Sequence, residues 1–159
     1  MTIYIGADHR GFALKEQIKA SLAGSGYEIV DVGALSVDPV DDYPDFARAV
    51  AEKVAVAAGG AAAPGADTSV RGIVICGSGF GVDIATNKFK GVRSALAMSV
   101  DHIRAGRHDD DVNVLSIAAD FTKPEEAVAI TKAFLETAFD SGQERYIRRI
   151  AKIAKIEEE

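Results

Sequence analysis

Two patterns of apolar and polar residues alternate along the chain. Short apolar runs rich in β-branched residues are typical of buried strands in a parallel sheet, and they occur at residues 2–6, 27–30, 73–75, 92–97 and 112–117. Between them, apolar residues recur every three or four positions, which predicts helices over about 12–22, 44–54, 82–88, 101–106, 125–138 and 143–155. Regular alternation of strand and helix predicts an α/β fold with a doubly wound parallel sheet that ends in a C-terminal helix.

Turn and capping residues refine these boundaries. Pro44, directly after Tyr43, is well placed as the first residue of a helix. Thr122 is expected to cap the helix that follows it, with Glu125 as the reciprocal partner three residues on. The low-complexity stretch 59–66 is read as a surface loop, because the halves on either side are too short to be separate domains. Residues 1–159 are therefore expected to form one domain.

Composition narrows the classes of function. A net charge of −6 argues against nucleic acid as the main partner. No apolar run approaches the roughly 20 residues of a membrane span, and the N-terminus lacks the basic and apolar regions of a signal peptide. A lone cysteine excludes an intrachain disulfide and fits a reducing compartment. We therefore expect a soluble cytoplasmic protein.

The stretch 72–88 concentrates the candidate chemistry. Three alternate glycines, Gly77, Gly79 and Gly81, follow a predicted buried strand and precede a helix. Glycine permits backbone conformations in which successive N–H groups converge on one anion. Cys76 ends the strand beside this loop and Ser78 lies within it. A thiolate beside an oxyanion cradle suits proton abstraction next to a carbonyl group.

Other polar residues fall at the same predicted edge. In an open parallel sheet the ligand crevice lies beyond the carboxyl ends of the strands, where Asp8 and His9 also fall. A lone cysteine is often only a small buried hydrophobic residue, but the neighbouring glycines favour a functional Cys76. For His9, a ligand-binding role and a purely structural role at the strand end both remain open.

The remaining motifs allow more than one interpretation. The glycine loop lacks the Lys-Ser/Thr ending of a P-loop, and Val82 stands where a dinucleotide fingerprint needs a small residue. The run of aspartates at 109–111 is expected to be a solvated turn rather than a metal site, and His102 and His108 are expected at the surface. Arg145 and Arg149 lie one helical turn apart, so they either face one anion such as a phosphate or form an exposed basic face.

Four segments together resemble a known family. GADHRGFALK at 6–15, DYPDFA at 42–47, ICGSGFGVDIATNKFKGVRSAL at 75–96 and VNVL at 112–115 are similar to type B ribose-5-phosphate isomerases and to the related galactose-6-phosphate isomerase subunits. The resemblance covers nearly the whole chain. It implies a Rossmann-like fold, a homodimer or dimer of dimers with sites at the subunit interface, and aldose-ketose isomerisation through a cis-enediolate without a metal or cofactor.

The resemblance also assigns roles by matching position. Cys76 would move the proton between C1 and C2, Ser78 would replace the usual threonine, and the amides from Gly77 to Gly81 would hold the enediolate oxygen. Sugar hydroxyls would be contacted by Asp8 and Tyr43. The phosphate would be held by His9, Arg145 and Arg149.

The chain departs from the family at three places. Asp109 stands where the family has a histidine that helps to open the sugar ring, and Asp110 where it has an asparagine; Asp120 replaces a phosphate-binding arginine, and the C-terminal Arg-His pair reads Arg145-Tyr146. The expected substrate is ribose 5-phosphate, with a tetrose 4-phosphate or a hexose 6-phosphate as alternatives. A non-catalytic sugar-phosphate sensor is the rival of another class.

Overall fold

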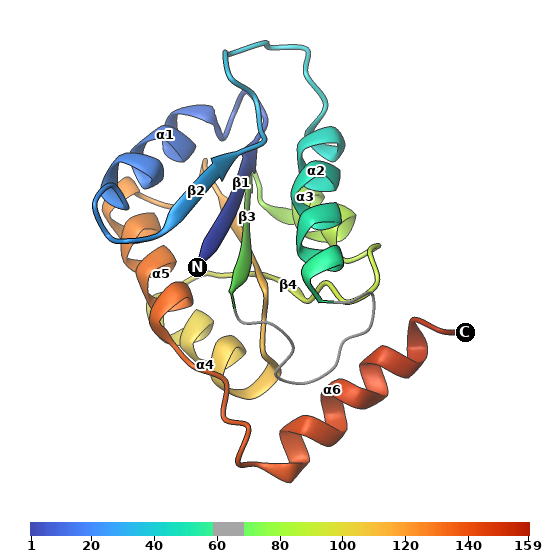
Figure 1. Cartoon of the computed structure of the whole chain (residues 1–159). Coiled ribbons are helices and arrows are strands. Elements are labelled where there is room, and N and C mark those ends of the chain that lie inside the picture. Colours follow the sequence, from blue (N-terminus) through green and yellow to red (C-terminus); the bar gives the residue numbers. More distant parts are fainter. Residues whose placement is uncertain (59–68) are drawn as a thin grey trace.

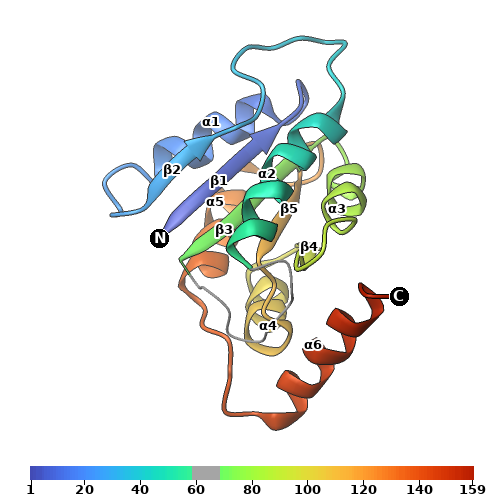
Figure 2. The ribbon, with the colours of Figure 1, turned by 45° about the vertical axis from the view of Figure 1, so that its right-hand side comes forward.

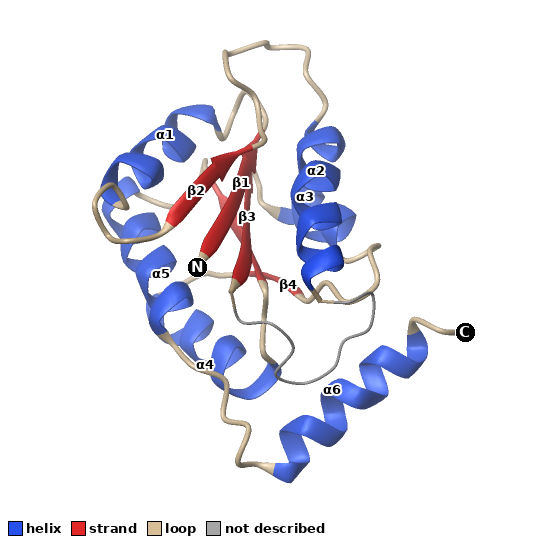
Figure 3. Cartoon of the chain, in the orientation of Figure 1, coloured by secondary structure: helices blue, strands red, loops and turns tan. Residues whose placement is uncertain are grey.

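The computed structural model describes residues 1–58 and 69–159. Within these residues all strands join one parallel sheet in the order β2-β1-β3-β5-β4 (Figures 1 and 3). The strands are β1 (Thr2–Ala7), β2 (Glu28–Asp31), β3 (Val70–Cys76), β4 (Ser94–Leu96) and β5 (Val114–Ala118). The expected doubly wound parallel α/β fold is confirmed.

Helices cover both faces of the sheet. The helices are α1 (Phe12–Ser21), α2 (Tyr43–Ala57), α3 (Phe80–Thr86), α4 (Val100–Asp110), α5 (Pro124–Glu136) and α6 (Glu144–Ile156). In Figure 1, α1, α4 and α5 lie on one side of the sheet and α2 and α3 on the other. None of the helices in the described ranges combines the length and hydropathy that crossing a bilayer would require.

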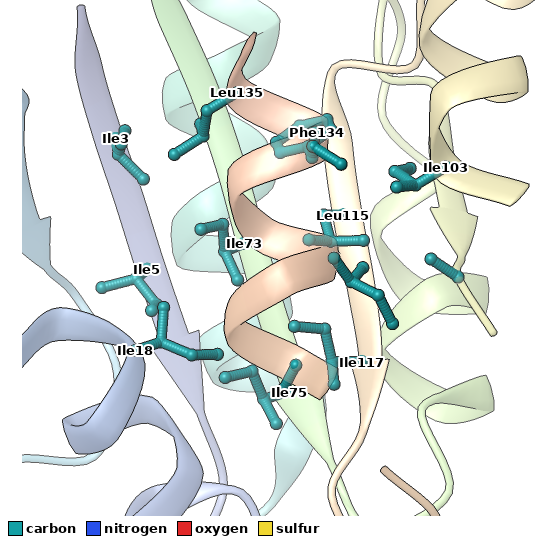
Figure 4. Close-up of a cluster of buried hydrophobic side chains, with 14 of the residues drawn as sticks. Ile3, Ile5, Ile18, Ile73, Ile75, Ile103, Leu115, Ile117, Phe134 and Leu135 are labelled. Carbon is teal, nitrogen blue, oxygen red and sulfur yellow. The ribbon is translucent and has the colours of Figure 1, made fainter. Parts of the chain in front are cut away.

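Each side of the sheet buries its own apolar cluster. Under α1 and α5, isoleucines from neighbouring strands interdigitate with Phe134 (Figure 4). Under α2, Val50 and Val54 pack against Val74 and Cys76. Full burial of an isoleucine or valine side chain contributes roughly 1.5–3 kcal/mol, so these two layers fix the strand ends in place.

The strand order reverses between β1 and β3. The chain moves from β1 to the edge strand β2 and returns to pair β3 on the other side of β1, with Ala7 opposite Ile75. Ligands of open α/β sheets bind beyond the carboxyl ends of the strands at such a switch point. Asp8 and Cys76 therefore stand next to each other where a ligand crevice is expected.

Helix α6 extends away from the rest of the chain. It lies beyond the amino-terminal ends of β1 and β3 and packs on α4 (Figures 1 and 2). Tyr146 and Ile150 are buried, whereas Ile153 and Ile156 are 41% and 69% exposed. At its far end, the Glu157 carboxylate accepts the Gly91 N–H at 2.9 Å. Much of the apolar face of α6 is thus left uncovered by its own chain.

Most expected elements are present, with four differences. β4 is shorter than the expected 92–97. Helix α4 continues past its expected end at Gly106, where a Cβ would lie 3.2 Å from the Val112 side chain. Thr122 does not cap α5: Lys123 is the N-cap, because Pro124 has the φ of a first helical residue. The loop expected at 59–66 lies outside the described residues.

The fourth difference concerns the aspartates at 109–111. Asp111 is 3% exposed and adopts a left-handed conformation with φ of 49° that ends α4. Its carboxylate accepts from Arg93 at 2.8 Å and from Arg107 at 2.7 Å. The prediction of a solvated turn is therefore wrong for Asp111, which is buried and ion-paired at the C-terminal end of α4. Asp109 and Asp110 belong to the last turn of α4.

Candidate active site

The ends of β1 and β3 bring together the first part of the site. The Asp8 N–H donates to the Ile75 carbonyl oxygen at 3.3 Å. The Asp8 Oδ1 atom accepts the N–H groups of Arg10 at 3.0 Å and Gly11 at 2.9 Å, and the residue is 5% exposed. Asp8 therefore shapes the turn into α1 at the point where β1 reaches Cys76.

Cys76 ends β3 as a free thiol that is 4% exposed. It packs in the apolar cluster beneath α2 and α3, and its carbonyl oxygen accepts the Ala119 N–H at 2.9 Å. The backbone on both sides of the thiol is thereby tied to the neighbouring strands. The Cys76 thiol therefore lies directly before the glycine loop, as the sequence predicts.

The three loop glycines are needed for different reasons. Gly79 has a φ of 74°, and a Cβ there would lie 2.5 Å from the Leu96 side chain. A Cβ on Gly77 would lie 2.4 Å from the Arg10 guanidinium carbon, and one on Gly81 would lie 2.6 Å from the Tyr43 ring. Arg10 and Tyr43 thus lie against the loop backbone in the space that a larger residue would occupy, while Ser78 between them is exposed.

His9 is held by a residue that sequence reasoning missed. Its Nδ1 atom lies 2.6 Å from Oδ1 of Asp41, which also accepts the His9 backbone N–H at 3.1 Å. The other Asp41 oxygen, Oδ2, is buried and meets no hydrogen-bond donor among the described residues. The spacing of aspartates in 38–45 does not reveal which of them turns inward, because loop geometry decides this.

Arg10 is a second residue that sequence reasoning missed. Its guanidinium forms an ion pair with Asp120, and the Asp120 N–H donates to the Gly77 carbonyl oxygen at 3.0 Å. Position 10 directly follows the expected site residues Asp8 and His9, and this adjacency was the signal available in the sequence. The ion pair joins the end of β1 to the end of β5 across the glycine loop.

The structure places the other expected site residues beyond the amino-terminal edge of the sheet, opposite the edge that holds Cys76. Asp109 and Asp110 lie just before β5, whose first residue, Val114, pairs with Gly72 near the start of β3. At about 3.3 Å per residue, the four steps from Gly72 to Cys76 alone span about 13 Å. Arg145 and Arg149 belong to α6, beyond the same amino-terminal ends (Figure 1). One chain therefore does not bring these four residues to Cys76.

This distant group has its own contacts, which involve Asp109, His108, Arg145 and Tyr146. Hydrogen bonds from His108 and Tyr146, together with the positive charge of Arg145, lower the pKa of Asp109. The His108 Nδ1 atom lies 2.7 Å from Asp109 Oδ1, and Arg145 donates to the Tyr146 hydroxyl at 2.8 Å. His102 and His108 are exposed, as expected. In residues 1–58 and 69–159, no three metal-ligating side chains converge.

An apolar pocket of about 260 Å³ opens beside Ser78. Its lining includes Phe80, Met98 and Phe121, which are 63%, 76% and 80% exposed. Exposed aromatic and methionine side chains grouped in this way are typical of an interaction surface rather than of scattered surface residues. The pocket runs from the glycine loop to the carboxyl ends of β4 and β5.

The arrangement suits proton transfer at a carbon next to a carbonyl group. Cys76 supplies a thiol at the strand end, the loop supplies backbone N–H groups for a developing oxyanion, and Asp8, Asp41 and Tyr43 border the same edge. His9 and Arg10 add an imidazole ring and a guanidinium group to this edge. A small, polyhydroxylated and negatively charged substrate matches this set.

Comparison with known proteins agrees with this chemistry. A family model described as Ribose/Galactose Isomerase matches residues 3–153. The probable ribose-5-phosphate isomerase B of Mycoplasma pneumoniae is 36% identical over 157 residues, covering 99% of this chain and 95% of the relative. Ribose-5-phosphate isomerase B of Mycobacterium tuberculosis is 39% identical, covering 99% of this chain and 90% of the relative.

A solved structure is also similar. Ribose-5-phosphate isomerase B of Mycoplasma genitalium with bound ribulose 5-phosphate has a TM-score of 0.89 and 38% identity, with coverage of 99% of this chain and 97% of that one. The similarity therefore includes the sequence, the fold and nearly the full length of both chains. This chain belongs to the ribose/galactose isomerase family.

Proposed function

We propose that this protein isomerises an aldose phosphate and its ketose, with ribose 5-phosphate and ribulose 5-phosphate as the main pair. The observation that carries the proposal is Cys76 at the β1/β3 switch point, directly before a glycine loop whose N–H groups suit an oxyanion. A sugar-phosphate sensor would have no use for a base at this place. One cysteine kept reduced fits the cytoplasm as the compartment.

The reaction needs one base and one anion site. The Cys76 thiolate removes the proton from C2 of the aldose, and the electron pair of that bond forms the C1–C2 double bond of a cis-enediolate. The loop amides hold the negative oxygen that results. A proton passes between the two enediolate oxygens, and Cys76 returns its proton to C1, which yields the ketose. No metal or redox step enters this sequence of transfers.

A second copy of the chain completes the site in this proposal. Asp109, Asp110, Arg145 and Arg149 lie far from Cys76 in one chain, so a symmetric dimer has to bring them to the partner's Cys76 edge. The uncovered Ile153 and Ile156 of α6 and the exposed apolar residues beside Ser78 support such an association. Arg145 and Arg149 would then bind the phosphate of a substrate held by the other subunit.

Subunit complementation tests the dimer. Cys76→Ala and Arg149→Ala homodimers should each be nearly inactive. After they are unfolded and refolded together, the mixed dimer has one site with both Cys76 and Arg149 intact, so about a quarter of wild-type activity should return. If all site residues belonged to one chain, mixing would restore nothing.

A tetrose 4-phosphate is the second candidate substrate, and Asp109 favours it. Pentose and hexose phosphates are mostly closed rings, and opening them needs a group that shuttles a proton. The lowered pKa of Asp109, caused first by its hydrogen bond from His108, makes this carboxyl a poor proton donor at neutral pH. A tetrose 4-phosphate cannot form the five-membered ring, because its terminal oxygen is esterified. Measured kcat/KM on ribose 5-phosphate, erythrose 4-phosphate and a hexose 6-phosphate decides among them, and turnover of none of them would refute the isomerase.

A further inference from the structure

Arg10 lies on the first glycine of the catalytic loop. A Cβ built on Gly77 would be 2.4 Å from both Cζ and Nε of Arg10, far inside the roughly 3.5–4.0 Å at which carbon atoms pack. The guanidinium therefore fills the place that the missing side chain leaves open. Because Gly77 follows Cys76 directly, Arg10 lies beside the proposed base.

The backbone contacts of two residues fix this position. The Arg10 N–H donates to Asp8 Oδ1 at 3.0 Å, which anchors the residue at the end of β1. Its side chain forms an ion pair with Asp120, whose own N–H donates to the Gly77 carbonyl oxygen at 3.0 Å. Asp120 is thereby tied to the same glycine that the guanidinium covers.

Only one guanidinium nitrogen of Arg10 donates a hydrogen bond to the described residues. The Nη2 atom donates to Asp120, whereas Nε and Nη1 donate no hydrogen bond to any residue in the ranges 1–58 and 69–159. Nε and Nη1 lie against Gly77, and the Arg10 side chain as a whole is 56% exposed, so the guanidinium borders both the loop backbone and solvent. A planar fork with unused donors matches the oxygens of a phosphate group.

The negative charge around the loop opposes binding of a phosphate, so a cation at this edge would favour it. Asp8, Asp41 and Asp120 place carboxylates at this edge, and the His9 ring is engaged by Asp41. A phosphate dianion entering this edge meets like charges, which raise its free energy unless a cation contacts it. Arg10 is an arginine that lies directly against this loop.

We propose that Arg10 binds the phosphate group of the substrate and that Asp120 positions it over Gly77. This inference rests on the proposed function, because it assigns the phosphate of that substrate. Asp120 holds the guanidinium in place and offsets part of its charge. Arg10 is thus a binding residue and Asp120 a positioning residue.

A pair of variants separates direct binding from charge balance. Arg10→Ala should raise KM about 10- to 100-fold while kcat stays within about threefold, since a charge-assisted hydrogen bond is lost in ground and transition state alike. That variant also leaves Asp120 as an unbalanced charge. Arg10→Ala/Asp120→Asn removes both charges together, and its KM should remain at least tenfold above wild type. Arg10→Lys, which keeps the charge without the fork, should lie between wild type and Arg10→Ala.

Arg48 and Glu52 provide the matched control. They form an exposed ion pair on α2 at 2.7 Å, with Arg48 70% exposed. Arg48→Ala and Arg48→Ala/Glu52→Gln should leave KM unchanged. Circular dichroism at the assay temperature establishes that every variant is folded.

A binding measurement keeps this inference separate from the proposed function. Inorganic phosphate should raise the melting temperature of the wild type and do so much less for Arg10→Ala and for the double variant. If the wild type isomerises no sugar phosphate but Arg10→Ala loses this protection, the proposed function fails and the phosphate site stands. If the double variant recovers wild-type KM and wild-type protection, Arg10 only neutralises Asp120 and the inference is overturned.

Discussion

His9 Nδ1 lies 2.6 Å from Asp41 Oδ1, and the same oxygen accepts the His9 backbone N–H at 3.1 Å. The backbone contact holds the residue, and the Nδ1 contact orients the ring with a proton between Nδ1 and the carboxylate. Asp41 is thus a positioning residue for a histidine at the end of β1.

Asp41→Asn is expected to raise KM for the sugar phosphate about tenfold with little change in kcat, in line with about 1.5 kcal/mol for a charge-assisted hydrogen bond. Steady-state kinetics with inorganic phosphate as competitor measures the effect, and the inhibition constant should rise in proportion. Asp38→Asn is the matched control, because Asp38 lies in the same loop and its side-chain carboxylate accepts only the Val40 N–H, at 3.1 Å, among the described residues. Equal KM values for the two variants would mean that the His9–Asp41 contact has no part in binding.

Cys76→Ala and Cys76→Ser should both lower kcat about 10²- to 10⁴-fold, because the general base is lost while the apolar packing of a buried side chain is largely kept. Exchange of the C2 proton with solvent deuterium, followed by NMR, should stop in both variants. Exchange at the wild-type rate in either variant would show that another group is the base.

Gly79→Ala should lower both the melting temperature and kcat. The new Cβ lies 2.5 Å from Leu96 and 3.0 Å from the Ala118 nitrogen, in addition to the roughly 1–2 kcal/mol cost of a left-handed residue. Gly26→Ala is the control, because Gly26 has a similar φ of 82° and no atom lies within 4 Å of its Cβ. Thermal unfolding should show a larger loss for Gly79→Ala, and only this variant should lose activity. Equal losses of stability would show that the loop relaxes around the added methyl group.

Asp109→His should increase kcat/KM for ribose 5-phosphate, whose ring must be opened, and leave kcat/KM for erythrose 4-phosphate nearly unchanged. The reason is that a neutral imidazole exchanges protons near pH 7, whereas a carboxylate whose pKa is lowered by the His108 hydrogen bond does not. His108→Ala controls for the neighbouring histidine. A wild type already faster on ribose 5-phosphate than on the tetrose would show that Asp109 or His108 opens the ring.

Acid should destabilise the contacts of Asp31. Burial alone would raise the pKa of Asp31, but hydrogen bonds from Lys15 and Lys19 at 2.5 Å and from the Gly33 N–H outweigh it, so the pKa is lowered. Stability from these contacts is therefore complete above the unfolded pKa of about 3.9 and is lost as the pH falls through the lower folded value.

Urea unfolding at pH 7 and pH 3 measures this loss. Asp31→Asn should cost about 3 kcal/mol at pH 7, because the fully buried Lys15 loses its nearest carboxylate and keeps Glu16 and the Ala34 carbonyl oxygen, and should cost less at pH 3. A cost that is the same at both pH values would contradict the ionised Asp31–lysine contacts.

The sequence alone determined the strands, the helices and the chemical centre. Continuous apolar runs and period-3.6 patterns are local, so runs such as 73–75 and the stripe of Val50 and Val54 were enough to predict the doubly wound sheet. Cys76 and the glycines after it are contiguous, so their placement at a strand end followed from the same local reading. The N-cap of α5 is a local error, since it is Lys123 and not the predicted Thr122, because the fixed φ of Pro124 outweighed the capping pattern.

Only the tertiary structure decided which distant residues meet. Asp41 reaches His9 and Asp120 reaches Arg10 across 32 and 110 positions of the chain, and no periodicity encodes such contacts. The burial of Asp111 depends on Arg93, which lies 18 positions away just before β4, in addition to the local contact with Arg107. The direction of each strand also separated Cys76 from Asp109 and Arg149, because a parallel sheet places the ends of its strands at one edge and their beginnings at the other.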